Sequence, residues 1–250
     1  MAVQIQVEQG GLERERVLHE QHDPHGRSSR LADVILGGQD GLVNVLGIVL
    51  GVAVAYSDPR VILTAGLAAA FAESVSMGAV AYTASLAEAD YYESEREREH
   101  RHIQQYPNQE KEEIRDIYRA KGFDGDLLDQ IVETITSNQD VWVRVMLAEE
   151  HQITPVDRRS ARTTALVVGL SSLIGSAIPL IPFLFVPVVP GMILAVIITA
   201  MVLFSAGAYK ARQTTVGRAA HSGVEMALIG VVSALVGYGI GLLFRVIPGG

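Results

Sequence analysis

The sequence contains no cysteine among its 250 residues. This absence excludes a disulfide framework, a thiolate metal site and a thiol nucleophile. Residues 1–30 are polar and charged, and they lack the apolar core of a secretory signal peptide, so we expect no such signal. Any metal site in this chain must therefore use oxygen, imidazole or thioether ligands.

Positive charge is scarce, and no region is basic enough to suggest a nucleic-acid partner. The chain carries a net charge of −8. Residues 88–157 hold 18 Asp and Glu against 8 Lys and Arg, a net charge of −10, so the rest of the chain is close to +2 with 12 basic and 10 acidic residues. Because a nucleic-acid binder needs a basic face, we exclude that class and treat residues 88–157 as a separate acidic insert.

Long apolar segments occupy most of the remaining chain. A bilayer core needs about 20 consecutive, mostly apolar residues per helix. The segment 163–209 has no charged residue and is too long for one span, and the prolines near its middle mark a turn because proline breaks helices. These prolines are Pro179, Pro182, Pro187 and Pro190. The predicted spans are residues 31–56, 61–87, 160–182, 188–210 and 219–243.

The fold class that follows is an all-α, polytopic membrane protein with five transmembrane helices. The five segments are apolar nearly all round, and a soluble protein of 250 residues could not bury them all. The domain organisation we expect is a polar tail (1–30), spans 1 and 2 (31–87), a helical domain (88–157) and spans 3 to 5 (158–245).

The positions of Lys and Arg predict the orientation. Basic residues precede spans 1 and 3 and lie between spans 4 and 5, which are positions on one side of a five-span protein. The opposite side has only Arg60 and Arg245. By the positive-inside rule, we expect the N-terminus and the acidic insert in the cytoplasm and the C-terminus outside.

The acidic insert reads as a series of helices. Residues 61–105 contain no helix breaker, and one helix of this length would extend about 68 Å. Asn108 is expected to cap a second helix that runs to about Lys121, and a third amphipathic helix lies near residues 127–135. A fourth is expected at 140–152, with three side chains spaced for burial: Val141, Val145 and Ala148.

The end of the long helix offers candidate metal ligands. Glu95, Glu99 and His102 share one helical face, whereas the neighbouring Glu–Arg pairs at i, i+3 and i, i+4 spacing are typical of a solvated surface. Pairs on later helices could join them: Glu110 with Glu113, and Met146 with Glu150. Carboxylates, an imidazole and a thioether suit Fe²⁺, Mn²⁺ or Zn²⁺ better than Mg²⁺.

An enzyme is the less favoured interpretation of the same residues. Di-iron carboxylate oxidases use Glu-x-x-His pairs, one from each of two helices. Here Glu97-x-x-His100 and Glu99-x-x-His102 overlap on one helix. We therefore expect no enzymatic activity and no prosthetic group.

Polar residues inside the spans indicate an ion pathway. A carboxylate at mid-bilayer is costly, so it suggests a function. Asp33 and Asp40 lie nearly on one face of span 1, and Glu73 and Met77 are one turn apart in span 2. The simpler alternative is that they only hydrogen-bond between helices. A buried carboxylate can exchange a metal ion for a proton, which makes proton coupling chemically plausible.

Pairs of glycines four residues apart allow helices to approach closely. Such pairs occur in span 1 and in span 5, and those of span 1 could serve packing within a subunit or a two-fold dimer contact. They are Gly37/Gly41, Gly47/Gly51 and Gly237/Gly241.

The combined pattern resembles the vacuolar iron transporters of plants, fungi and prokaryotes. The matching stretches are DVILGGQDGLVNVLGIVLGV (33–52), AESVSMGAVAYTAS (72–85) and PNQEKEEIRDIYRAKG (107–122), within a resemblance that covers roughly residues 30–245. The resemblance implies a homodimer that moves Fe²⁺, and often Mn²⁺, out of the cytosol in exchange for protons. It also implies a cytoplasmic, metal-binding insert.

The resemblance assigns roles residue by residue. The pathway residues fall on Asp33, Asp40, Glu73 and Met77, and the ligands of the insert fall on Glu99, Glu110, Glu113, Met146 and Glu150. A further family glutamate falls on His102, a departure that bears on pH sensitivity and on the preference for Fe²⁺. Glu95 remains an alternative to Glu99.

Three histidines near the N-terminus, His19, His22 and His25, could collect metal. The favoured interpretation is that they belong to a mobile tail whose first part, Glu8–Glu20, is a polar helix. The membrane would be the plasma membrane of a prokaryote or the vacuolar membrane of a eukaryote. The alternative function is a membrane-anchored metal-binding or sensing protein that transports nothing.

Overall fold

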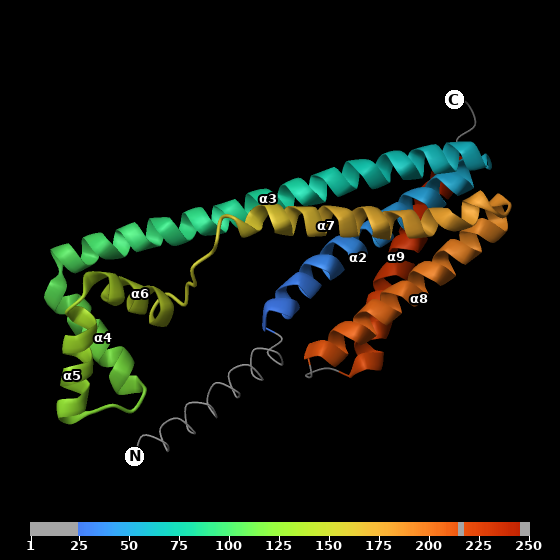
Figure 1. The fold of residues 1–250 in the computed structure, drawn as a ribbon. Coiled ribbons are helices and arrows are strands. Elements are labelled where there is room, and N and C mark those ends of the chain that lie inside the picture. The colour runs from blue at the N-terminus through green and yellow to red at the C-terminus, as the bar shows by residue number, and fades with distance from the viewer. Residues whose placement is uncertain (1–24, 215–217, 246–250) are drawn as a thin grey trace, which may run out of the picture. The chain divides into compact units, whose positions relative to one another are not determined.

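The computed structural model describes residues 25–214 and 218–245, with side chains described for residues 30–213 and 218–245. The polar helix predicted at Glu8–Glu20 and the side chains of His19, His22 and His25 lie outside these ranges. The described backbone is helical throughout its regular elements, as predicted (Figure 1).

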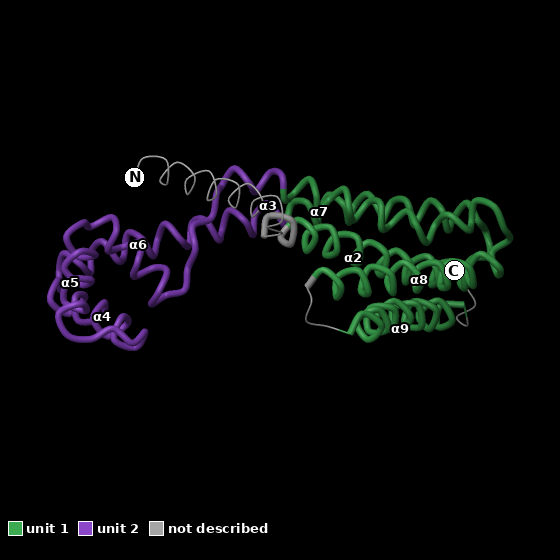
Figure 2. The backbone as a smooth tube through the Cα atoms, turned by 60° about the horizontal axis from the view of Figure 1, so that its bottom comes forward, with its two compact units in different colours: residues 1–79, 164–250 green, residues 80–163 purple. Residues whose placement is uncertain are grey.

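The chain divides into two compact units, shown in Figure 2. Residues 1–79 and 164–250 form the first, which we call the span unit, and residues 80–163 form the second, which we call the insert unit. The helices in chain order are α2 (His25–Ala55), α3 (Pro59–Gln105), α4 (Pro107–Ala120), α5 (Gly125–Thr136), α6 (Gln139–Glu149), α7 (Ser160–Ala177), the 3-10 helix η1 (Ile178–Leu184), α8 (Val188–Thr214) and α9 (Ala219–Arg245).

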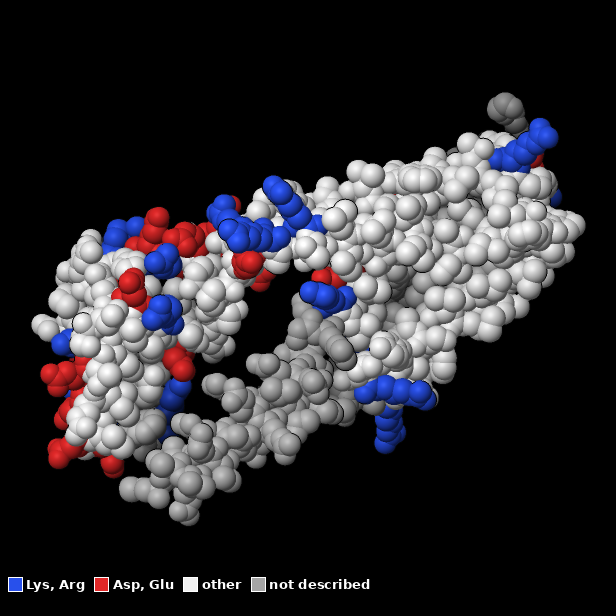
Figure 3. All heavy atoms as spheres, viewed as in Figure 1, with Lys and Arg blue, Asp and Glu red and all other residues white. Residues whose placement is uncertain are grey.

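In the described part of the chain, five helical segments are long and apolar enough to cross a membrane, which agrees with the predicted number of spans. They are Arg30–Ala55, Pro59–Gln105, Ser160–Leu184, Val188–Gln213 and Ala219–Arg245. Many of their apolar side chains face outward, including Leu166 (65% exposed) and Ile174 (66% exposed), as expected for helices in contact with lipid. On the visible face in Figure 3, charged side chains gather over the insert unit and near the ends of the spanning helices.

The proline cluster divides the long uncharged segment in two, as predicted. Helix α7 tightens into η1, which contains Pro179 and Pro182. The carbonyl of Pro182 accepts hydrogen bonds from the N–H groups of Phe185 (3.1 Å) and Val186 (3.1 Å), and α8 begins two residues later. Because prolines cannot donate these bonds, the helix stops here and the chain reverses.

Helix α2 is packed closely on two sides by helices of its own chain. At Gly37 and Gly41, a Cβ atom would overlap the backbone of α7. At Gly51, it would lie 3.0 Å from the carbonyl oxygen of Gly237 in α9. The Ser233 hydroxyl also donates a hydrogen bond to the Val43 carbonyl oxygen (2.8 Å). The two glycine pairs of α2 therefore pack within the subunit, one against α7 and the other against the pair of α9.

The insert unit has its own apolar core, formed around Ile114, Trp142, Val143, Met146 and Leu147, each at most 5% exposed. Helices α4 and α5 are strongly amphipathic, and their apolar faces meet in this core. The core therefore holds α4, α5, α6 and the end of α3 together.

Two details of the predicted insert are wrong. Helix α4 starts at Pro107 rather than behind a capping Asn108, because proline suits the first helical position, where its missing N–H needs no partner. In α6, Ala148 is exposed and Val141 and Val145 are only partly buried, since Trp142 and Met146 define the face that packs inward. Asn138 caps this helix by accepting the N–H groups of Asp140 (3.0 Å) and Val141 (3.2 Å).

The contact of Gly47 and Gly51 in α2 with Gly237 and Gly241 in α9, which we call the glycine seam, leads to a prediction about stability. In Gly237→Ala, the new Cβ meets the backbone of Gly47. We expect a loss of about 1–3 kcal/mol, the usual cost of overpacking. In the matched variant Gly239→Ala, nothing lies within 4 Å of the new Cβ, so the higher helix propensity of alanine should raise stability by up to about 1 kcal/mol. Thermal unfolding in detergent measures both, and equal midpoints would contradict the seam.

Candidate functional site

The span unit contains a cavity of about 960 Å³ lined by α2, α3 and α9. Most of its wall is apolar or glycine. Its polar side chains include Asp40 and Asn44 from α2, Glu73 from α3 and Ser233 from α9, and the thioether of Met77 also lies on the wall. A polar patch of this kind between apolar helices is unusual in a membrane and suggests a site for a charged or polar ligand.

Helical periodicity explains how these side chains meet. Asp40 and Asn44 are one turn apart on α2, and Glu73 and Met77 are one turn apart on α3. The Asn44 amide donates a hydrogen bond to a carboxylate oxygen of Glu73, and the Glu73 and Asp40 carboxyl groups interact with each other. Oxygen donors and a thioether together can coordinate a borderline divalent cation such as Fe²⁺ or Mn²⁺.

Three of the four residues predicted for the pathway, Asp40, Glu73 and Met77, line this cavity. The fourth, Asp33, lies two turns before Asp40 on α2, is partly buried and does not line the cavity. Asp33 and Asp40 therefore share a helical face, as the spacing predicts, at two different heights along the span.

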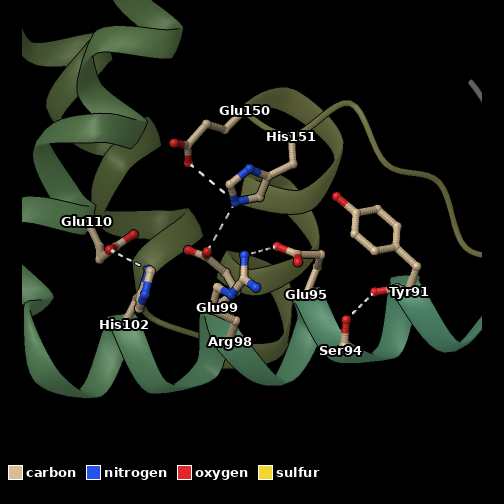
Figure 4. Close-up of polar contacts among 9 residues, drawn as sticks. All are labelled: Tyr91, Ser94, Glu95, Arg98, Glu99, His102, Glu110, Glu150 and His151. Carbon is tan, nitrogen blue, oxygen red and sulfur yellow. Dashed lines mark hydrogen bonds and ion pairs between the residues drawn. The ribbon is translucent and has the colours of Figure 1, made fainter.

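A second cavity, of about 310 Å³, lies in the insert unit. Its wall carries four carboxylates and two imidazoles. The lining residues are Glu99, His102, Tyr106, Gln109, Glu110, Glu113, Glu150 and His151. They come from the end of α3, the start of α4 and the residues that follow α6, and Figure 4 shows several of them pointing toward one another.

The histidines lie within a few ångströms of the carboxylates. His151 Nε2 is 3.4 Å from Glu99 Oε2 and 4.0 Å from Glu150 Oε2. His102 Nδ1 is 3.8 Å from Glu110 Oε1. Two of these contacts join residues far apart in the sequence, by 8 positions for His102 with Glu110 and by 52 for Glu99 with His151.

Two of the carboxylates are buried without full compensation. The side chains of Glu99 and Glu110 are only 3% and 6% exposed, and one oxygen of each, Glu99 Oε1 and Glu110 Oε2, has no hydrogen-bond partner within the described part of the chain. No lysine or arginine whose side chain the structure describes lines the cavity. A buried carboxylate is stable only when it is protonated, paired or bound to a cation, so this cavity favours a proton or a cation.

The pKa values of these carboxyl groups also indicate that the cavity favours a proton or a cation. Burial, followed by the nearby charges of Glu99 and Glu113, raises the pKa of Glu110 to about 8. Burial is also the main cause that raises the pKa of Glu150, with a further contribution from Glu113. At neutral pH, Glu110 therefore holds a proton that a metal ion would have to displace.

The carboxylates have not converged on one point. Among the described residues, no three His, Asp or Glu side chains stand in a ready metal-binding arrangement.

The residues predicted from the sequence as metal ligands differ in whether they line this cavity. Glu99 lines the cavity, whereas Glu95 forms an ion pair with Arg98 (3.0 Å) and does not. Met146 is 0% exposed within the apolar core and does not line the cavity, so its predicted ligand role would require its thioether to turn out of that core. Its role stays a prediction.

Sequence reasoning missed His151, Gln109 and Tyr106 at the cavity. His151 directly follows Glu150, and a histidine beside a candidate ligand was a signal that could have been used. Its position depends on where α6 ends, at Glu149, and helix ends are the least certain feature of a sequence-based prediction.

Comparison with known proteins gives consistent matches along most of the chain. Residues 31–242 match the model of the VIT family. Vacuolar iron transporter 1 of Oryza sativa subsp. japonica is 32% identical, over 88% of this chain and 87% of the relative. Vacuolar iron transporter 1 of Eucalyptus grandis is 29% identical, over 92% and 93%, and the vacuolar iron transporter of Plasmodium falciparum (isolate 3D7) is 28% identical, over 89% and 87%.

The raised pKa of Glu110 predicts how the stability of the metal-free insert depends on pH. Between its ordinary value of 4.5 and about 8, the folded state holds a proton that the unfolded state has released. Stability should therefore fall by up to about 1 kcal/mol per pH unit as pH rises through this range, and then level off.

The readout is the fluorescence of Trp142, the single tryptophan of the chain, which is buried in the insert core. Thermal unfolding of the full chain with a chelator present, from pH 5 to 9, measures the slope. Glu110→Gln should flatten it, whereas Glu133→Gln, an exposed glutamate on α5, should leave it unchanged. An unchanged slope in Glu110→Gln would assign the pH dependence to other groups.

Proposed function

The chain belongs to the VIT family, and on this basis we propose that it transports divalent metal ions across a membrane. The proposed substrate is Fe²⁺, with Mn²⁺ as a second candidate. The relatives named above are iron transporters by name, and transport is not an enzymatic function, so the di-iron oxidase interpretation is set aside.

The observation that carries the proposal is the cavity in the span unit. Asp40, Glu73 and Met77 meet there with Asn44 on helices long enough to cross a bilayer. Charged groups in such helices are expensive unless they serve a substrate or a structural pairing. The cavity volume of about 960 Å³ leaves room for a partly hydrated cation, which a purely structural hydrogen bond would not need.

Export from the cytosol in exchange for protons is the proposed direction and coupling. The same carboxylates can bind a metal ion or a proton, but not both at full strength. Protons that enter the cavity from the acidic side would therefore release the metal there. Asp33 would provide a further binding site for the ion on the same face of α2.

The insert is proposed to collect metal on the cytoplasmic side. Its cavity offers Glu99, His102, Glu110, Glu113 and Glu150, and the excess of negative charge would raise the local concentration of cations. The N-terminus lies on the same side in this proposal. The membrane is the plasma membrane in a prokaryote and the vacuolar membrane in a eukaryote.

We further propose a homodimer as the transporting form. The glycine pairs of α2 pack within the subunit and do not by themselves identify the surface of the dimer contact. In detergent, light scattering should give a protein mass of twice the 26.9 kDa of one chain. A stable, transport-active species of 26.9 kDa would contradict the dimer.

The transport prediction is tested in liposomes. In liposomes with a pH gradient, purified wild-type protein should move Fe²⁺ and Mn²⁺ toward the acidic side. A pH-sensitive dye should report that protons move in the opposite direction. Asp40→Ala removes one of the two interacting carboxylates and should abolish metal flux. Competition among Fe²⁺, Mn²⁺, Co²⁺ and Zn²⁺ ranks the substrates.

The control is Glu225→Gln, which changes an exposed carboxylate of α9 outside the cavity and should keep the wild-type flux. Normal flux in Asp40→Ala would contradict the assignment of the pathway. Metal binding without any flux in the wild type would favour the alternative function, a membrane-anchored metal sensor.

A further inference from the structure

His151 is placed at the insert cavity by the way α6 ends. The helix stops at Glu149, and the N–H groups of Glu150 and His151 both bond to the Met146 carbonyl oxygen, at 2.9 and 3.2 Å. The next residue, Gln152, has a φ of 56°, in the left-handed region, so the chain turns away sharply. The imidazole of His151 is left facing Glu99 on α3, as Figure 4 shows.

The distance between these two side chains matches a pair of metal ligands. Two donors that each lie about 2.1 Å from a tetrahedral metal are separated by about 3.4 Å. His151 Nε2 and Glu99 Oε2 are 3.4 Å apart, which is long for a charge-assisted hydrogen bond. The same nitrogen faces Glu150 Oε2 at 4.0 Å, so one imidazole edge is shared between two carboxylates.

A second observation indicates that the cavity is built for a cation. Glu99 Oε1 and Glu110 Oε2 are buried and have no hydrogen-bond partner among the residues that the structure describes, although their side chains line the cavity. The side chain of His151, in contrast, is 33% exposed, so an ion can reach its nitrogen from solvent. The cavity thus has buried carboxylate oxygens on one side and a solvent-accessible imidazole on the other, an arrangement that a metal ion can enter from solvent.

We propose that His151 is a metal ligand of the insert. This inference rests on the proposed metal binding by the insert and adds to it a residue that sequence reasoning did not find. With His102 on α3, it makes the site a mixed carboxylate and imidazole site with nitrogen donors from two separate elements.

The proposal has a consequence for metal preference. Imidazole ligands favour Zn²⁺, Co²⁺ and Fe²⁺ over Mn²⁺ and Mg²⁺, which prefer oxygen. Two imidazoles in a cavity of four carboxylates should therefore shift the insert toward the first group. Loss of one imidazole should weaken binding of Zn²⁺ more than binding of Mn²⁺.

The test uses the full chain in detergent, stripped with a chelator and then loaded with one equivalent of Zn²⁺. X-ray absorption spectroscopy counts imidazole ligands through their outer-shell scattering. His151→Gln should lose imidazole scattering relative to the wild type. Its affinity for Zn²⁺, from competition titration, should fall at least about tenfold, with a smaller fall for Mn²⁺. Because variants are compared, any imidazole elsewhere contributes equally.

The glutamine substitution also separates a ligand from a structural hydrogen bond. Glutamine can still donate to Glu99, so a merely structural His151 would leave both the spectrum and the affinity unchanged, and that result would overturn the proposal. His100→Gln is the matched control, since His100 lies on α3 but does not line the cavity, and it should behave as the wild type.

Failure of this inference is distinguishable from failure of the transport proposal. An unchanged imidazole count in His151→Gln overturns the ligand assignment, whatever the liposomes show. Absent flux with an altered imidazole count overturns transport and leaves the ligand assignment in place.

Discussion

The span unit depends on how closely the backbone of α2 approaches its neighbours. Gly47 and Gly51 meet Gly237 and Gly241 of α9, and a Cβ atom at Gly237 or Gly241 would overlap the backbone of α2. The same four glycines line the large cavity, so the residues that allow close packing also leave its wall free of side chains. In a bilayer, where lipid is as apolar as leucine, such backbone contact is a main source of helix association. The same four glycines thus serve both the close packing of α2 against α9 and the wall of the cavity.

The insert unit is stabilised in a different way, because it has an apolar core of its own. Ile114 and Met146 are fully buried, and they fix α4 and α6 firmly enough to hold Glu110 and Glu150 near Glu99. The apolar core stabilises the unit, and the crowded carboxylates destabilise it as long as they are ionised and unpaired. This opposition is what makes a cation or a proton a stabilising ligand of the unit.

The sequence predicted the features that follow from long-range hydropathy and from helix breakers. The five spans, the continuous helix α3 and the turn at Pro179 and Pro182 all belong to this class. Burial within α6 was predicted wrongly because several faces of that helix are apolar, and only packing against α4 and α5 selects the face of Trp142. His151 was missed because its position depends on the turn after α6, a tertiary detail without a periodic signal.

The glycine seam has one more consequence, which concerns entropy. An interface built from large side chains must immobilise their rotamers, at a cost of about 0.5–2 kcal/mol per residue that grows with temperature. Glycine has no rotamers to immobilise, so the contact between α2 and α9 forms without that loss. Association of the two helices, once each has formed, should therefore weaken less on warming along this seam than along an interface of leucine and methionine.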